Sequence, residues 1–290
     1  MLRFKSLILI YSIIILFNYH SFPTVANNTV IDVANIPLIK QIIPLPDIEL
    51  GETSKGFTGT GLTYDREEDV FWIGNCGKNH PSDEIFYATI VKVSKDSGTI
   101  LGEIKLYDIF PYMSDVQGVT IDESNNTIWF CSFAENKIRH ISKSGHIISS
   151  FDINRPIGIA YSRISDTLWV LTKSELINIE KDGAIIESLN FDIDGQDQLF
   201  LDEVNNIIYL TAGSSYYSDS YVYKIDLFKK EIDLAFILKE SFAVEGIYIE
   251  DDKMYILNYG YYHNAKVPVN QINKYDISNL MTCEEFVKKN

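Results

Sequence analysis

A twelve-residue pattern recurs along this chain of 290 residues and constrains its fold more than any other feature. The copies are GLTYDREEDVFW at 61–72, GVTIDESNNTIW at 118–129, GIAYSRISDTLW at 158–169, QLFLDEVNNIIY at 198–209 and a shortened one, GIYIEDDKMY, at 246–255. Each copy has an apolar run, a turn rich in Asp, Glu, Ser or Asn, and a second apolar run that ends in Trp or Tyr. This order is typical of a β-hairpin.

Two further strands are expected after each of the first four hairpins. The segments 89–106, 137–153, 175–191 and 221–237 each hold two apolar runs around a tight turn, and three of these turns contain Ser-Gly or Asp-Gly. The repeating unit is therefore four antiparallel strands, recurring every 40 to 57 residues. That is the period of a β-propeller blade. The sequence predicts an all-β fold, a β-propeller with five blades.

The last repeat predicts how the ring closes. It supplies only three strands, the third at 271–277, whereas the apolar segment 38–48 precedes the first hairpin. We expect this N-terminal segment to complete the last blade, because closure removes the exposed edges of an open sheet. A sixth blade between Gly61 and Gly118 is the alternative; we interpret the excess length there as a long loop, 75–88.

The recurring glycines and aromatic residues have expected structural roles. A glycine opens the innermost strand in four repeats, where blades crowd together and a side chain would meet the neighbouring backbone. We expect the recurring aromatic residues to fill the core between blades rather than to stack on a ligand. They are Trp72, Trp129, Trp169, Tyr209 and Tyr255.

The first 26 residues resemble a secretory signal peptide in composition. Arg3 and Lys5 precede an apolar run at 7–17, and small residues lead to a cleavage site after Ala26. An uncleaved anchor is the alternative, but an 11-residue run is short for a bilayer core of about 30 Å. The predicted organisation is a signal peptide at 1–26, an extension at 27–37, the propeller at 38–277 and a C-terminal helix or tail at 278–290. The protein is expected to be secreted, periplasmic or lumenal, with no membrane span after signal removal.

The composition limits the classes of ligand that we expect. The formal net charge is −15, which disfavours nucleic acid and anionic lipid as ligands. Of the three cysteines, Cys76 and Cys131 follow equivalent strands, so a disulfide between them is an alternative to two buried thiols. Asn27 and Asn125 lie in glycosylation sequons, which matter only if the host modifies exported proteins. We expect a monomer.

The pattern Gly-apolar-x-apolar-Asp, a polar turn and apolar-Trp-apolar resembles the repeats of NHL-type propellers, of the SdiA-regulated family and of the regucalcin/gluconolactonase superfamily. The resemblance covers residues 38–277. Lactonases of the regucalcin type hold a divalent cation on the propeller axis, and one ligand is a Glu beside the glycine that opens a blade. The segment VEG at 244–246 matches that pattern, which implies Glu245 as a ligand. The equivalent positions in the other repeats are Thr60, Gln117, Ile157 and Asp197.

Propeller geometry predicts where binding residues converge. Innermost strands begin and second strands end at one face, which carries all the long connections, while the other face has short polar turns. Binding residues concentrate on such loops. We therefore expect a rim of amide, imidazole and phenol side chains on the loop-rich face. Its members are Asn75, His80, Gln117, Tyr216, Tyr217, Asn258, Tyr261, Tyr262 and His263.

Two acids, Asp197 and Glu245, are expected near the axis at the same face. Carboxylate and amide oxygens are typical ligands of Ca²⁺, so these acids are candidate ligands of Ca²⁺ or another divalent cation. A polar channel without an ion is the alternative. The sequence carries no nucleophile-elbow, zinc-protease or P-loop motif. It sets no distance between Glu245 and a second acid–base group such as His263 or Asp115.

Two functions follow from these observations. The preferred one is a binding module that engages a glycan, peptide or protein through the loop-rich face and is not an enzyme. The other is a metal-dependent hydrolase of the lactonase or phosphoesterase type, in which Glu245 helps to hold an axial cation. Convergence of the acids and amides on one point would distinguish them.

Overall fold

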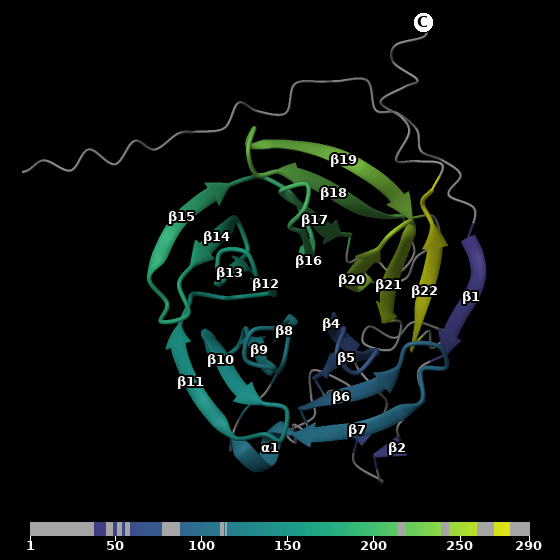
Figure 1. Cartoon of the computed structure of the whole chain (residues 1–290), viewed down its shortest axis with the longest axis vertical. Helices are drawn as coiled ribbons and strands as arrows, with labels where there is room; N and C mark the ends of the chain where they lie inside the picture. The colour runs from purple at the N-terminus through teal and green to yellow at the C-terminus, as the bar shows by residue number, and fades with distance from the viewer. Residues whose placement is uncertain are drawn as a thin grey trace, which may run out of the picture.

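Five antiparallel sheets of four strands each stand around a central axis in the computed structural model (Figure 1). The structure describes residues 38–44, 49–50, 54–55, 59–76, 88–110, 113, 115–213, 219–238, 244–259 and 270–278. The predicted five-bladed β-propeller is confirmed. The alternative of a sixth blade between Gly61 and Gly118 is not observed among the described residues. The described part of that interval contains three further strands of the first blade and the short helix α1 (Leu106–Ile109).

The blades follow the repeats in order, each with its first strand innermost. Blade 1 contains β4 (Gly59–Asp65), β5 (Val70–Asn75), β6 (Thr89–Ser94) and β7 (Ile100–Lys105). Blade 2 contains β8 (Val119–Asp122), β9 (Thr127–Ser132), β10 (Lys137–Ser142) and β11 (Ile147–Asp152). Blade 3 contains β12 (Gly158–Ser162), β13 (Thr167–Leu171), β14 (Glu175–Ile179) and β15 (Ile185–Asn190). Blade 4 contains β16 (Gln196–Asp202), β17 (Ile207–Ala212), β18 (Ser220–Asp226) and β19 (Glu231–Leu238).

Blade 5 joins the two ends of the propeller. It contains β20 (Val244–Glu250), β21 (Lys253–Tyr259), β22 (Asn270–Asp276) and, at its outer edge, β1 (Leu38–Pro44). β1 runs antiparallel to β22, with Gln41 opposite Lys274 and Pro44 opposite Gln271. The expected closure by the N-terminal segment is therefore confirmed. A separate two-stranded sheet pairs β2 (Glu49–Leu50) with β3 (Ser54–Lys55).

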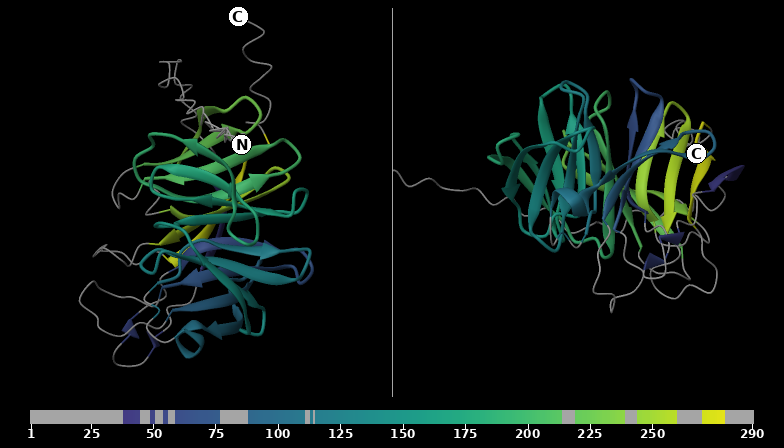
Figure 2. Two further views of the ribbon diagram at one scale, coloured as in Figure 1. Left: turned by 90° about the vertical axis from the view of Figure 1, so that its left-hand side faces the viewer. Right: turned by 90° about the horizontal axis from the view of Figure 1, so that it is seen from below.

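The two faces of the ring differ in their connections. Seen from the side, the strands run roughly along the axis, so their ends lie at the two faces (Figure 2). The short-turn face carries the first turn of every blade. The residue before the second strand has a positive φ in four of these turns, and it is Asp or Asn each time: Asp69, Asn126, Asp166 and Asn206. Asp and Asn tolerate this left-handed conformation better than other non-glycine residues, which explains the repeated turn composition.

Five hydrophobic clusters fill the spaces between neighbouring blades. Each contains one of the recurring aromatic residues, which are at most 6% exposed. Trp72 lies between blades 1 and 2, and Tyr255 lies between blades 5 and 1. The prediction that these residues form the inter-blade core is confirmed, and their burial holds the ring together.

The glycines that open the innermost strands form a narrow waist around the axis, defined by Gly61, Gly118, Gly158 and Gly246. A Cβ on Gly118 would lie 2.7 Å from the Cα of Gly158 in the next blade. A Cβ on Gly246 would lie 2.6 Å from that of Leu62. Contacts this short are not tolerated by a packed backbone, so only glycine fits here. Blade 4 is the exception, because Gln198 stands in the glycine position.

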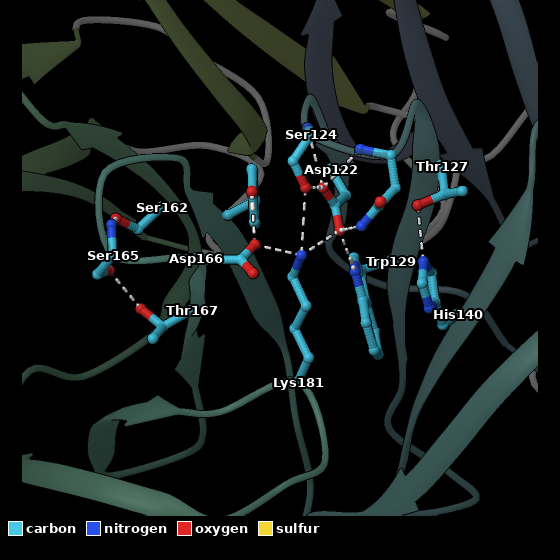
Figure 3. Close-up of polar contacts among 12 residues, drawn as sticks. Asp122, Ser124, Thr127, Trp129, His140, Ser162, Ser165, Asp166, Thr167 and Lys181 are labelled. Atoms are coloured by element: carbon cyan, nitrogen blue, oxygen red, sulfur yellow. Dashed lines mark hydrogen bonds and ion pairs between the residues drawn. The ribbon is translucent and has the colours of Figure 1, made fainter.

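An ion-pair clamp recurs on the short-turn face. In each case a lysine from the turn between the third and fourth strands of one blade reaches an acid at the end of the first strand of the preceding blade. The pairs are Lys143 with Asp65, Lys181 with Asp122, and Lys95 with Glu250. Figure 3 shows the second clamp, where Lys181 lies between Asp122, at 2.8 Å, and Asp166. The clamps link neighbouring blades at their ends.

Burial and hydrogen bonding shift the pKa of the clamped acids. Burial of Asp122 acts to raise its pKa, but hydrogen bonds from Lys181, Ser124 and Asn125 outweigh this and bring the value to about 2. The Nε1 of Trp129 also donates to this carboxylate, at 3.4 Å. Asp65 is arranged alike, with Trp72 donating at 3.0 Å and a lowered pKa. These carboxylates are fully satisfied, which marks them as structural.

The remaining predictions concern the cysteines, membrane-spanning segments and the two ends of the chain. Cys76 and Cys131 are both buried and are not joined by a disulfide, so that alternative is not observed. Within the described ranges no helix is long and apolar enough to cross a membrane. The signal peptide at 1–26, the extension at 27–37 and Cys283 lie outside the described residues, as does all but the first residue of the predicted tail, 278–290.

Candidate functional site

Bulges at the start of two innermost strands build the axial end of the loop-rich face. In blade 5, Val244 pairs with Asn258 and Gly246 with Leu257, so Glu245 is an extra residue without a strand partner. In blade 4 the pairing register shifts between Gln196 and Leu199. A bulge turns the extra side chain away from the regular pleat, and this directs Asp197 and Glu245 toward each other.

Asp197 and Glu245 form what we call the acid pair. Their carboxyl groups belong to neighbouring blades and lie within hydrogen-bonding reach of one another. Both residues keep partial exposure, although the surrounding blades remove most of the water from the carboxyl groups. Burial raises the pKa of Asp197 to about 6, and burial together with the negative charge of Asp197 raises the pKa of Glu245 well above its usual range. The pair therefore tends to share one proton near neutral pH.

Gln198 supports the acid pair from the position that is glycine in the other repeats. Its side-chain amide donates to Oδ1 of Asp197 at 3.1 Å and to the carbonyl of Ile157 in blade 3 at 3.4 Å. The same carbonyl accepts the backbone N–H of Gly118 at 2.7 Å. The repeat pattern does not mark Gln198 as a site residue, but a glutamine where the other repeats have glycine is a signal that points to it.

Two further predicted residues lie in blade 2. Gln117 is partly exposed just before the innermost strand β8, and its side chain lies close enough to Asp115 to act to lower the pKa of that acid. The Asp115 carboxylate also accepts from Ser132 Oγ at 2.9 Å and from the backbone N–H of Phe133 at 3.0 Å. Burial raises the pKa of Asp115 despite these bonds. Its donors lie within blade 2, so they favour a structural role over pairing with Glu245.

The structure places Asn75 and Asn258 away from solvent. Asn75 is fully buried, and its Nδ2 donates to Thr89 Oγ1 on β6 at 3.1 Å. Asn258 is 1% exposed, and its Oδ1 accepts from Asn273 on β22 at 2.7 Å. Each amide therefore has a partner on the third strand of its own blade. The other predicted rim residues lie outside the described ranges: His80, Tyr216, Tyr217, Tyr261, Tyr262 and His263.

The described residues offer an incomplete set of metal ligands. No group of three or more His, Cys, Asp or Glu side chains in the described ranges is arranged to hold a metal ion. The acid pair supplies two carboxylates, whereas Ca²⁺ takes six to eight oxygen ligands. A cation at this position would therefore need backbone carbonyls, water or ligands from other parts of the chain.

Comparisons with known proteins support the fold. No family model and no curated protein sequence matches the chain. Among solved structures, it is similar to a glutaminyl cyclase from Myxococcus xanthus, with a TM-score of 0.55, 13% identity and coverage of 83% of this chain and 97% of that one. It is also similar to a chain of a nidogen/laminin complex, with a TM-score of 0.52, 13% identity and coverage of 79% and 78%.

A third similar structure is a luciferin-regenerating enzyme, with a TM-score of 0.50, 11% identity and coverage of 79% of this chain and 94% of that one. By name, two of these structures are enzymes and the third is a protein complex. At such low identity the likeness shows a shared β-propeller fold and leaves activity to be argued from the site.

Proposed function

We propose that this protein is a binding module whose loop-rich face engages a peptide or protein, and that the acid pair anchors a cationic group of that ligand. The observation that carries the proposal is the contact between Asp197 and Glu245. No described lysine, arginine or histidine forms an ion pair with either carboxylate. Clamped acids elsewhere in the protein have such a partner.

The charge of the acid pair determines which ligand group it attracts. Two carboxylates in contact repel one another when both are ionised, so one keeps a proton until a cation arrives. A lysine or arginine side chain from a ligand would supply that charge. Such a side chain only donates hydrogen bonds, so it can bond to both carboxylates once they are ionised. A cationic anchor favours a peptide or protein over a neutral glycan. If the predicted export occurs, such partners would be met outside the cytoplasm.

A divalent cation on the axis is the second candidate, and the same contact favours it. With Glu245 and Asp197 as two of its ligands, a Ca²⁺ ion would allow both carboxylates to ionise. In a hydrolase of the lactonase type such an ion would act as a Lewis acid. The small ligand set among the described residues is the reason for ranking this candidate second.

Thermal unfolding and isothermal titration test both candidates on the purified chain. The probes are a tetralysine peptide, CaCl₂ and EDTA, and the variants are Asp197→Asn and Glu245→Gln. Asp194→Asn, an exposed acid on the same connection, controls for diffuse attraction to the acidic surface. A probe present at 100 times its Kd adds about 2.7 kcal/mol of stability.

The outcomes separate the candidates. Stabilisation by tetralysine that both site variants lose and the control keeps supports the binding module. The same pattern with CaCl₂, reversed by EDTA, supports the axial cation and justifies a screen of hydrolase substrates. If each probe acts equally on all variants, the acid pair is not an anchor and the proposal fails.

A further inference from the structure

The short-turn face has a cavity of its own at the axis, on the opposite side of the glycine waist from the acid pair. It has a volume of about 100 Å³ and is lined by all five innermost strands and by four of the first turns. All of its lining residues lie in the described part of the chain. This cavity plays no part in the function proposed above.

The floor and one wall of the cavity are apolar. Leu62, Ile159, Leu199 and Ile247 form the floor, because each follows directly the residue that stands at the waist. The rings of Tyr64, Phe200 and Tyr248 form the wall: the centroids of Tyr64 and Tyr248 are 5.0 Å apart, and those of Phe200 and Tyr248 are 5.5 Å apart. The tyrosine hydroxyls are directed elsewhere, to Asp69 and Glu250.

The size of the cavity limits the group that enters it. An apolar cavity of about 150 Å³ accommodates benzene. A cavity of about 100 Å³ therefore suits a smaller group, such as a branched aliphatic side chain of three or four carbons. The remainder of such a ligand would lie at the mouth.

The mouth carries charges of both signs in alternation. The first residue of the first turn is Arg66 in blade 1, Glu123 in blade 2, Arg163 in blade 3 and Glu203 in blade 4, and all four line the cavity. The two guanidinium groups flank one carboxylate, since Arg66 lies 3.2 Å and Arg163 lies 3.6 Å from Glu123. Both arginine side chains are more than 60% exposed.

These groups keep capacity for a ligand. A guanidinium has five N–H donors, so each arginine can bind a second carboxylate without leaving Glu123. Glu203 accepts from Ser162 Oγ at 2.9 Å and from the backbone N–H of Ile164 at 3.0 Å, and a carboxylate has further acceptor sites. A head group with a carboxylate beside an ammonium matches this alternation best.

We infer that the short-turn cavity binds a free α-amino acid with a short aliphatic side chain, such as valine or leucine. The side chain enters the apolar floor, the α-carboxylate bonds to Arg66 and Arg163, and the α-ammonium faces Glu203. The end of a peptide chain is the competing occupant, because Ile164 and Val204 beside the mouth are 74% and 88% exposed.

Isothermal titration of the full chain distinguishes these occupants. Leucine carries both charges, N-acetyl-leucine only the carboxylate and leucinamide only the ammonium, while glycine lacks the side chain. We expect leucine to bind at least tenfold more tightly than each of the other three. The double variant Arg66→Gln/Arg163→Gln should weaken leucine binding at least tenfold. Arg155→Gln, an exposed arginine outside the cavity lining, should leave it unchanged.

Three results would overturn the inference. Absence of leucine binding up to roughly 10 mM would show that the cavity is not an amino acid site. Equal binding of N-acetyl-leucine or leucinamide would show that one charge suffices, which indicates a peptide end instead. Equal binding of glycine would show that the apolar floor contributes nothing. Because the arginine side chains are exposed, the double variant is expected to fold, and its unfolding midpoint verifies this.

Discussion

The two ends of the propeller axis treat their carboxylates in opposite ways. At the short-turn face, Asp65 and Asp122 each lie beside a lysine from the next blade, and their pKa values are lowered. At the loop-rich face, the partners of Asp197 and Glu245 among the described residues are each other and the Gln198 amide, and their pKa values are raised. Acids that face a lysine stabilise the fold. The acid pair, which no cation neutralises among the described residues, lowers stability until a ligand neutralises it.

The waist that separates the two ends gives the largest expected effect. Gly118→Ala places a Cβ 2.7 Å from the Cα of Gly158, and the free energy of unfolding should fall by about 3 kcal/mol. Gly102→Ala is the matched control, because its Cβ would meet nothing closer than 3.9 Å. Urea denaturation measures both. Equal stability of the two variants would show that the waist is not tightly packed.

The clamp at the short-turn face gives the next effect. Asp122→Asn removes the charge that faces Lys181, so the free energy of unfolding at pH 7 should fall by about 2–3 kcal/mol. Asp152→Asn, whose carboxylate is 81% exposed beside Lys137, should change it by less than about 0.5 kcal/mol.

The clamp also predicts a pH dependence. Since the pKa of Asp122 is about 2 when folded, its contribution is complete above about pH 4 and is lost as the pH falls toward 2, by roughly 2 kcal/mol. Denaturation series between pH 2 and 6 measure it. A wild-type protein and an Asp122→Asn variant that lose stability in parallel over this range would contradict the assignment.

The acid pair should show the opposite sign. A raised folded pKa means that the folded state binds more protons than the unfolded one, so stability falls as the pH rises above about 4.5. Glu245→Gln should therefore raise the free energy of unfolding by about 1–2 kcal/mol at pH 8 and leave it unchanged at pH 4. The measurement is made in EDTA. A variant less stable than wild type at pH 8 would mean that the ionised pair already has a stabilising partner.

The mouth of the short-turn cavity should have the smallest effect on stability. Arg66 and Glu123 form an exposed pair, and Arg66→Gln should change the free energy of unfolding by no more than about 0.5 kcal/mol. Thermal unfolding measures this. A larger loss would mean that the mouth residues hold the blades together rather than standing ready for a ligand.

Much of the fold was predictable because its signals are local. Alternating apolar residues, Asp or Asn in the left-handed turn positions and an aromatic residue at the end of the quoted pattern recur in each repeat, with the turn shortened in the fifth. These patterns act within a few residues of one another, so they predicted the hairpins, the five blades and the inter-blade aromatic core. The closure by β1 followed from counting strands in the last repeat.

The sites were less predictable because their contacts join different blades. Asn75 and Asn258 are expected at the axis, and the described bonds of their side chains include one to the third strand of their own blades, which the repeat pattern does not reveal. The lysines of the clamps recur in sequence, yet their acids lie in the preceding blade, which only the ring brings close. The alternation of charge at the cavity mouth becomes apparent only when the ring places the first turns of four blades side by side.

The sequence by itself determined the number, order and hairpin pattern of the blades, since these depend on the local alternation of apolar and polar residues. Tertiary structure alone decided which charges are neutralised. Two bulged strands bring Asp197 against Glu245, and the ring brings Lys181 against Asp122. The physical reason is that a pKa depends on every group within a few ångströms, and the nearest groups here come from distant parts of the chain.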